Sequence, residues 1–207
     1  WDFNPTPTEL VSLTAFYKLI KNPISRIEVA SAGGYLSYEN IADKATVAGV
    51  EVEVRKNLFV RPVSSAANGM NKLSFGLNGS YIYTNAKMPL ATVTTGSQLE
   101  GAAPWIANFD LSHNYTKGDH SFINTLVLNY VSDKIYTIGT QGYQEIMTLD
   151  FVSQAKLNKY ISLTLKARNL LNPSYKLSRK ANESGEEVVL SDYKKGINIS
   201  LGVSCTF

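Results

Sequence analysis

The sequence is short of charge, cysteine and long apolar runs. Charged residues make up 18% of its 207 residues, below the roughly 25% usual in soluble domains. The single cysteine, Cys205, excludes an internal disulfide and any site built from several cysteine ligands. No stretch approaches the ~18–20 consecutive apolar residues of a membrane-spanning helix, which excludes helical membrane proteins. A net charge of +3 is too small to indicate nucleic-acid binding, and a mean hydropathy of −0.10 with abundant apolar residues argues against disorder.

Catalytic and metal-binding patterns are also missing. The only two histidines, His113 and His120, flank the segment 117–119 without further ligands at zinc spacing. The sequence contains no Gly-rich phosphate loop, no nucleophile elbow and no paired-histidine motif. We therefore expect no enzyme activity, no cofactor and no metal centre.

What the sequence has in abundance is alternation of apolar and polar residues. In 46–56 the side chains of Val50, Val52 and Val54 fall on one face, opposite two glutamates and an arginine. Such a period of two identifies a strand with one apolar and one polar face. The pattern predicts about eight strands, many longer than the ~5–6 residues usual in soluble sheets. The predicted strands are 10–21, 46–56, 72–84, 105–115, 121–133, 145–157, 161–168 and 194–207.

The connections between these strands are alternately short and long. Segments 117–119 and 157–159 are tight turns rich in Gly, Asn and Asp. The connections 22–43, 86–103, 134–144 and 174–192 are long and polar, whereas 57–70 is long where a short turn is expected. Tight turns at one end and large loops at the other are typical of transmembrane β-barrels. We therefore predict an all-β fold, made of antiparallel up-and-down strands of such a barrel.

Three features indicate that the apolar faces meet lipid. These faces carry almost no charge, the opposite faces are rich in Ser, Thr, Asn and Gly, and aromatic residues gather near strand ends, as interfacial girdles do. Two alternatives stay open: a soluble lipocalin-like ligand-binding barrel, and a small self-contained eight-stranded outer-membrane barrel with a structural or adhesive role. The predicted girdle consists of Tyr17, Tyr81, Tyr83, Trp105, Tyr115, Tyr130, Tyr160 and Tyr193.

Six segments spread along the chain carry a resemblance to a known family. They are AFYKLIKNPI (15–24), YEN (38–40), ATVAGVEVE (45–53), LEGAAPW (99–105), RNLLN (168–172) and YKKG (193–196). In their order and spacing they resemble the C-terminal part of the β-barrel of TonB-dependent outer-membrane receptors, especially forms common in Bacteroidetes-type bacteria. The resemblance implies a barrel of about 22 strands with an N-terminal plug domain. Residues 1–207 would then be one C-terminal segment of that wall, without plug or N-terminal strands.

The resemblance also implies a function and partners. Such receptors bring scarce nutrients, such as iron chelates, corrinoids or oligosaccharides, across the outer membrane of Gram-negative bacteria. The implied partners are the lipid bilayer, the TonB energy-coupling complex acting through the plug, the barrel-assembly machinery, and a small-molecule or glycan ligand. The last strand resembles the assembly signal of such barrels, with Ser200, Gly202, Cys205 and Phe207 at its polar, glycine, apolar and terminal aromatic positions. An ordinary alternating edge strand is the other interpretation of these four residues.

Two long loops and one polar face supply the candidate site residues. Loops on a rigid scaffold usually carry binding, so the ligand candidates are Tyr136, Gln141, Tyr143, Arg179 and Lys180, which are otherwise ordinary solvated loop residues. Seven charged residues should project into the lumen, where they would contact a plug or form cross-strand ion pairs. These are Glu51, Glu53, Arg55, Asp110, Asp150, Lys166 and Arg168.

The first residue is Trp1, and no signal peptide is recognisable. We therefore expect a processed chain or a piece of a longer protein. A piece of a larger wall would not close on itself, and its first and last strands would remain exposed edges. Segment 11–19 should then not pair with segment 197–207.

Overall fold

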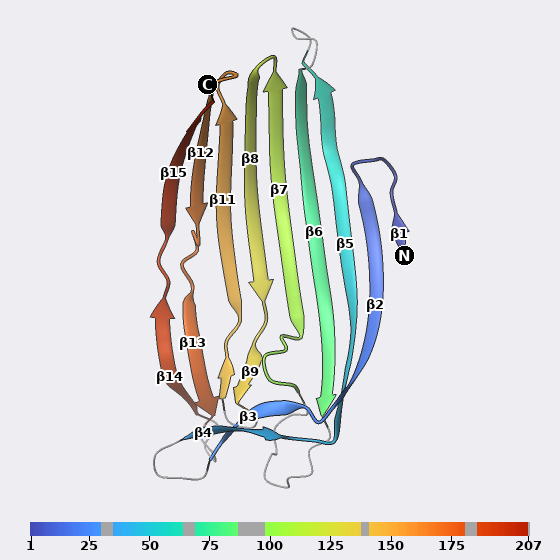
Figure 1. Ribbon diagram of the computed structural model, residues 1–207, viewed down its shortest axis with the longest axis vertical. Coiled ribbons are helices and arrows are strands. Elements are labelled where there is room, and N and C mark those ends of the chain that lie inside the picture. The colour runs from blue at the N-terminus through green and yellow to red at the C-terminus, as the bar shows by residue number, and fades with distance from the viewer. Residues whose placement is uncertain (30–34, 64–68, 87–97, 138–140, 181–185, 207) are drawn as a thin grey trace.

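The computed structural model describes residues 1–29, 35–63, 69–86, 98–137, 141–180 and 186–206 (Figure 1). All regular structure in these residues is β-strand, and the strands are connected in antiparallel pairs. None of the described residues forms a helix long and apolar enough to cross a membrane. The strands are β1 Asp2–Phe3, β2 Leu10–Lys21, β3 Ile24–Glu28, β4 Leu36–Asn40, β5 Lys44–Pro62, β6 Met70–Ala86, β7 Trp105–Lys117, β8 His120–Val131, β9 Lys134–Thr137, β10 Gln141–Tyr143, β11 Ile146–Lys156, β12 Ile161–Arg168, β13 Ser174–Lys180, β14 Glu187–Lys194 and β15 Asn198–Cys205.

One long, curved sheet dominates the molecule. Its nine strands follow the order β1-β2-β5-β6-β7-β8-β11-β12-β15, so sequence neighbours lie side by side (Figure 1). The sheet is open, because β15 pairs only with β12 and β1 only with β2. Segment 11–19 pairs with β5 rather than with the last strand, as predicted. The closed ring that both alternative interpretations require is therefore not formed by the described residues.

All eight predicted strands are present, with bounds close to those expected. The main difference from the prediction concerns residues 57–70, which were expected to form a long connection. In the structure β5 continues to Pro62 and β6 begins at Met70. The pairing shifts between Asn57 and Phe59, so Leu58 forms a bulge. A bulge reverses the alternation of apolar and polar residues along the strand, and the strand continuation was therefore missed.

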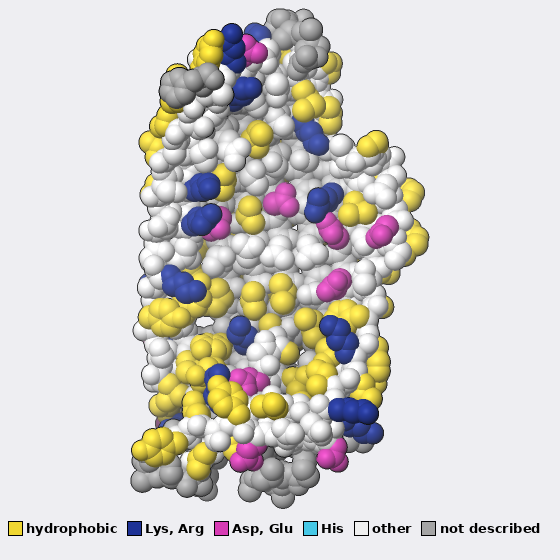
Figure 2. Space-filling model, viewed as in Figure 1, with side chains coloured by type: hydrophobic (Ala, Val, Ile, Leu, Met, Phe, Trp, Pro, Cys, Tyr) yellow, Lys and Arg dark blue, Asp and Glu magenta, His cyan; other side chains and the backbone are white. Residues whose placement is uncertain are grey.

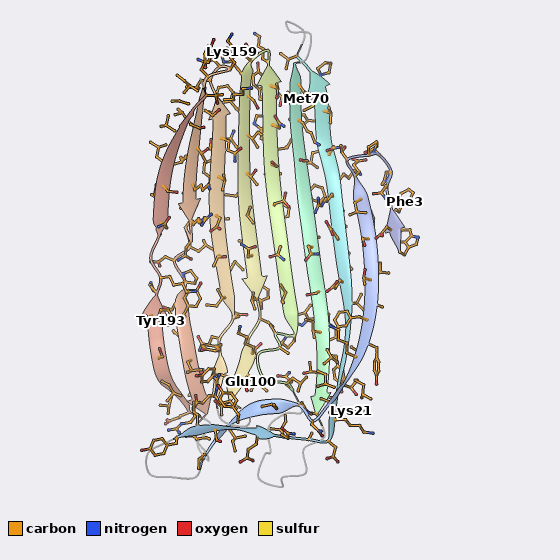
Figure 3. All side chains as sticks on the ribbon, viewed as in Figure 1. Phe3, Lys21, Met70, Glu100, Lys159 and Tyr193 are labelled. Atoms are coloured by element: carbon orange, nitrogen blue, oxygen red, sulfur yellow. The ribbon has the colours of Figure 1, made fainter. Side chains whose placement is uncertain are left out.

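The predicted long loops contain strands as well. β3 and β4 form a two-stranded hairpin that crosses one end of the main sheet (Figure 1). A four-stranded sheet of order β14-β13-β10-β9 forms at the same end. We call this end the loop end. The opposite end, with the last residue of β5, the first residue of β6 and the turns 117–119 and 157–159, is the turn end. Figure 3 labels Glu100, Lys21 and Tyr193 toward the loop end and Met70 and Lys159 at the turn end.

Two asparagines separate the main sheet from the four-stranded sheet. Asn169 and Asn172 have φ angles of 58° and 44°, in the left-handed region that asparagine tolerates better than most residues. The Asn169 Nδ2 donates to the Gly196 carbonyl at 2.7 Å, and the Gly196 nitrogen donates to Asn172 Oδ1 at 3.0 Å. The β12–β13 junction is thereby fastened to the β14–β15 junction. This explains why the pairing of β12 with β15 ends at the same level of the molecule at which the pairing of β13 with β14 begins.

The register sorts the side chains of the main sheet onto two faces. The outer face carries rows such as Val11, Val54, Leu77, Phe109, Leu128 and Leu149. The inner face carries rows such as Ser12, Glu53, Asn78, Asn108, Asn129 and Thr148. Many outer-face side chains are exposed, including Leu201, whose exposed fraction is 73%. Little protein therefore covers the apolar face.

Aromatic pairs border the outer face at both ends. Tyr81 and Trp105 have ring centroids 4.5 Å apart toward the loop end, and Tyr115 and Phe122 are 6.5 Å apart toward the turn end. The ten residue-to-residue steps from Trp105 to Tyr115 span ~33 Å along the strand, or ~25 Å across a bilayer at the usual tilt. This spacing matches the apolar band of an outer-membrane barrel.

The buried core is small and lies at the loop end. It consists of Ile41, Ala42, Ala45 and Ala86, each at most 5% exposed, with Ile27, Leu99 and Ile135 packed against them. These residues join the β3–β4 hairpin to the ends of β5, β6 and β9. The core therefore fixes the position of the hairpin over the loop end of the sheet.

Candidate functional site

A cavity of about 470 Å³ opens on the inner face near the loop end. Its floor includes Val131, Ile146 and Thr148 of the main sheet, and its walls come from the four-stranded sheet. Figure 2 shows a face with charged side chains over the middle of the main sheet and hydrophobic side chains gathered toward the loop end. The cavity is lined by Val131, Ser132, Lys134, Tyr143, Gln144, Ile146, Thr148, Tyr175, Lys176 and Tyr193.

Two of the three cavity tyrosines form a stacked pair. Tyr175 on β13 and Tyr193 on β14 are cross-strand partners, with ring centroids 5.4 Å apart and an interplanar angle of 16°. The Lys195 ammonium lies 4.0 Å from the Tyr175 ring centroid, within cation–π distance. The pair presents flat ring surface and a positive charge beside the cavity. Such a surface can bind a flat ring of a ligand by stacking.

The third cavity tyrosine links the cavity to the β3–β4 hairpin. Tyr143 on β10 meets Tyr136 on β9 edge to face, with centroids 5.1 Å apart. The Arg26 guanidinium of β3 lies 4.0 Å from the Tyr136 ring centroid. Burial raises the pKa of the Tyr143 hydroxyl, and neighbouring tyrosines raise this pKa further. The hydroxyl is therefore neutral across the physiological pH range.

A carboxylate fastens the hairpin in this position. Glu100 Oε2 accepts hydrogen bonds from the Ser25 hydroxyl at 2.8 Å and from the Arg26 backbone nitrogen at 2.5 Å. Its other oxygen, Oε1, lies 3.5 Å from Arg26 Nη2. Ser25 is only 1% exposed, so in the intact fold its hydroxyl depends on the Glu100 oxygen rather than on bulk water. We call Ser25, Arg26 and Glu100 the hairpin latch.

The structure gathers the five predicted ligand residues on one small sheet. Tyr136 and Tyr143 pack against each other, and Tyr143 lines the cavity. Gln141 and Arg179 are cross-strand partners, and Arg179 Nη1 is 3.4 Å from Glu28 Oε1, so this side chain contacts β3 rather than the cavity. The backbone of Lys180 pairs opposite Glu187. Ligand binding by these residues stays a prediction.

Sequence reasoning missed the structural roles of four residues of this region. Arg26 and Glu100 had no local pattern that would have brought them together, because they are 74 residues apart. Tyr175 is in a segment already identified as a loop with aromatic residues. Tyr193 was predicted as a girdle residue, but it stacks on Tyr175 beside the cavity instead. Tyr193 directly precedes the predicted strand 194–207 and so resembles an aromatic residue at a strand end, which explains the error.

The predicted lumen charges lie on the inner face, but their interactions differ from a cross-strand network. Arg55 Nε is 2.6 Å from Glu53 Oε1, so this ion pair lies within β5. Among the described residues it is the only ion pair on the main sheet. Asp150 Oδ1 accepts a hydrogen bond from the Asn169 nitrogen at 2.8 Å. Glu51, Lys166 and Arg168 occupy inner-face register positions without an ion pair in this part of the chain.

Asp110 lines a second, polar cavity of about 300 Å³ on the inner face. Its carboxylate lies over Gly76, its cross-strand partner, so closely that a Cβ atom at Gly76 would overlap it. Arg55, Lys72 and Ser74 also line this cavity. Gly76 therefore makes room for the acidic side chain on the inner face.

The remaining candidates lie away from both cavities. His113 is on the outer face, where its Nε2 donates to Asn71 Oδ1 at 2.9 Å, while His120 begins β8 beside the tight turn. Among the described residues no three His, Cys, Asp or Glu side chains are arranged to hold a metal ion. Ser200, Gly202 and Cys205 lie on the edge strand β15, and Phe207 lies outside the described residues. An assembly signal at these positions stays a prediction.

Comparison with known proteins identifies the family. The model of the family described as TonB dependent receptor-like, beta-barrel matches residues 1–170. The matched segment ends just after β12, and β15 extends the same sheet by pairing with β12. No curated protein and no solved structure gave a significant match to the chain.

Proposed function

The chain belongs to the TonB-dependent receptor-like β-barrel family, and on this premise we propose that it is the C-terminal wall of an outer-membrane receptor. The family is one of outer-membrane transporters in Gram-negative bacteria. We propose that this receptor takes up a scarce nutrient such as an iron chelate, a corrinoid or an oligosaccharide. Residues 1–207 would act as one unit, and a TonB complex would supply energy through a plug domain elsewhere in the receptor.

The observation that carries this proposal is the amphipathic open sheet. Its outer face is apolar, bounded by aromatic pairs ~25 Å apart, and little protein covers it. Its inner face is polar and charged, as suits a lumen filled by water and a plug. Its edges, β1 and β15, each have one unpaired side. Further strands of the receptor would pair with these edges and close the wall.

The loop-end cavity is the best candidate for ligand capture. Its volume of about 470 Å³ lies within the ~300–1,000 Å³ usual for small-molecule sites. The stacked rings of Tyr175 and Tyr193 could hold a sugar or aromatic chelator, and Lys134 and Lys176 could pair with its acidic groups. In this proposal Tyr136 and Arg26 support the cavity from behind rather than touch the ligand.

Growth and binding experiments on the whole receptor test this proposal. A strain lacking the receptor would be complemented with the wild type, with Tyr175→Ala, or with Tyr160→Ala, which removes an exposed tyrosine at the turn end. The strains would grow on a defined iron chelate, corrinoid or oligosaccharide as the limiting nutrient. We expect one nutrient to require the receptor, and Tyr175→Ala to reduce its uptake at least tenfold while Tyr160→Ala does not.

Two results would contradict the proposal at different levels. If the receptor is extracted without detergent and shows no heat-modifiable migration, the chain is not an outer-membrane wall. If it behaves as a membrane barrel but Tyr175→Ala and Tyr160→Ala take up the nutrient equally well, the cavity is not the capture site.

A further inference from the structure

The outer face carries basic side chains at the turn end. Arg61 of β5 lies in one cross-strand row with Asn71, Tyr115 and Phe122. Lys117 lies one row closer to the tight turn, opposite His120. This end of the outer face therefore combines positive charge with an aromatic row, and the next row away from the turn holds Phe59, Leu73 and His113.

The bulge at Leu58 keeps the Arg61 side chain on the outer face. Its guanidinium is 5.3 Å from the ring centroid of Phe59, which lies on the same face beyond the Leu58 bulge. Without the bulge, alternation would place residue 61 on the inner face. The bulge therefore has a consequence beyond local pairing, because it brings a cation to the surface that faces lipid.

Polar donors next to Arg61 complete the group. Since the Asn71 carbonyl oxygen accepts from His113 Nε2 at 2.9 Å, the Asn71 amide group is left as a donor beside Arg61. Two acidic residues lie at this end. Glu9 Oε1 accepts from the Asn57 backbone nitrogen at 3.1 Å, and Asp119 is in the tight turn. Neither forms an ion pair with Arg61 or Lys117 in the described part of the chain.

We infer that Arg61, Asn71 and Lys117 form a basic surface that binds the phosphate groups of anionic phospholipids in the leaflet at the turn end. This inference rests on the proposed function, because it requires the outer face to meet lipid. Aromatic belts lie at headgroup depth, and Arg61 shares the row of Tyr115 and Phe122. Charge complementarity identifies the occupant, because Arg61 and Lys117 are cations without an ion pair in the described part of the chain and phosphate oxygens are anionic acceptors. In this position the lipid anchors the turn end at the membrane surface.

Lipid retention by the whole receptor in nanodiscs tests the inference. The discs would contain phosphatidylcholine alone or mixed with phosphatidylglycerol, and native mass spectrometry would count phosphatidylglycerol molecules retained after release. Basic residues near a membrane surface contribute roughly fivefold each to anionic lipid binding. We expect Arg61→Gln and Lys117→Gln each to lower retention about fivefold, and the double variant about 25-fold.

Lys72→Gln is the matched control. Lys72 lies on β6 one residue from Asn71, but on the inner face, where it lines the polar cavity. Its loss should leave phosphatidylglycerol retention unchanged. Equal losses for Lys72→Gln and Arg61→Gln, or full retention by the double variant, would overturn the inference.

Heat-modifiable migration separates this inference from the proposed function. A receptor that never inserts into discs or never shows heat-modifiable migration contradicts both. A receptor that inserts normally, but retains phosphatidylglycerol independently of Arg61 and Lys117, contradicts only the lipid site. Should the double variant fail to fold, Lys117→Gln alone keeps the test open, because this residue lies at the exposed end of β7.

Discussion

Removing the Glu100 carboxylate should release the β3–β4 hairpin without unfolding the wall. Glu100→Ala leaves the buried Ser25 hydroxyl and the Arg26 nitrogen without their acceptor. Hydrogen bonds to a charged group contribute about 1.5–3 kcal/mol each, whereas the partly exposed ion pair adds at most about 1 kcal/mol. Since water can reach part of the vacated space, we expect a loss of about 2–4 kcal/mol in hairpin docking.

Hydrogen exchange measures this loss directly. The backbone amides of β3 and β4 exchange through local opening, whose free energy sets their protection. A loss of about 2–4 kcal/mol corresponds to roughly 30- to 700-fold faster exchange in β3 and β4. Amides of β7 and β8 next to the tight turn 117–119, at the turn end, should not change.

Glu39→Ala is the control for the latch. It removes an exposed carboxylate from β4 of the same hairpin, so it tests a general effect of lost negative charge. Faster exchange in both variants would point to such an effect. Unchanged exchange of the β3 and β4 amides in Glu100→Ala would refute the role of the latch. Among the described contacts of the hairpin, only those with Glu100 are buried charge-assisted hydrogen bonds from β3.

Three further predictions concern the wall, the strand junction and the cavity. Gly49→Ala should destabilise the receptor by about 1–3 kcal/mol, since a Cβ atom there would lie 2.7 Å from the Tyr81 backbone carbonyl oxygen, whereas Gly79→Ala should not, because its nearest neighbour is 4.0 Å away. Equal heat-modifiable unfolding temperatures would contradict this. Asn169→Ala should cost about 1–3 kcal/mol in the same assay, because it removes a side-chain hydrogen bond and a residue suited to the left-handed conformation. Because the pKa of Tyr143 is raised in the fold, its contribution to stability is complete below about pH 10 and is lost as the pH rises through the folded pKa. Tyr143→Phe should therefore reduce the loss of stability at alkaline pH. An unchanged loss of stability at alkaline pH would contradict this prediction.

The wall was predictable because its signal is local and periodic. Alternation over eight to twelve residues, as in β2 and β15, indicates a strand without knowledge of its partner. The prediction failed at Leu58, where one extra residue reverses the phase, and the strand continuation to Pro62 was assigned to a loop. A bulge depends on how two strands pair, so the alternation of residues within one strand does not predict it.

The candidate site was predictable only in part for a similar reason. Tyr136 and Tyr143 were recognised because aromatic residues stand out in a polar loop. The latch joins Arg26 to Glu100 across 74 residues, and the Tyr175–Tyr193 pair depends on β13 and β14 forming a sheet within a predicted loop. Contacts of this kind follow from the topology, and periodicity within one segment cannot identify them.

The two ends of the molecule should respond differently to mutation because their stability has different sources. In the wall the apolar side chains face outward, so single truncations such as Leu201→Ala change lipid contacts and open no internal cavity. At the loop end the buried apolar cluster is small, and the hairpin depends on few polar contacts, such as those of Glu100 and Ser25. Because Arg26 contacts Tyr136 and Tyr136 contacts Tyr143, we expect the loss of the Glu100 carboxylate to displace the Arg26 guanidinium and to alter the cavity wall. Ligand capture should therefore be more sensitive to substitutions in the latch than to most substitutions in the strands that carry it.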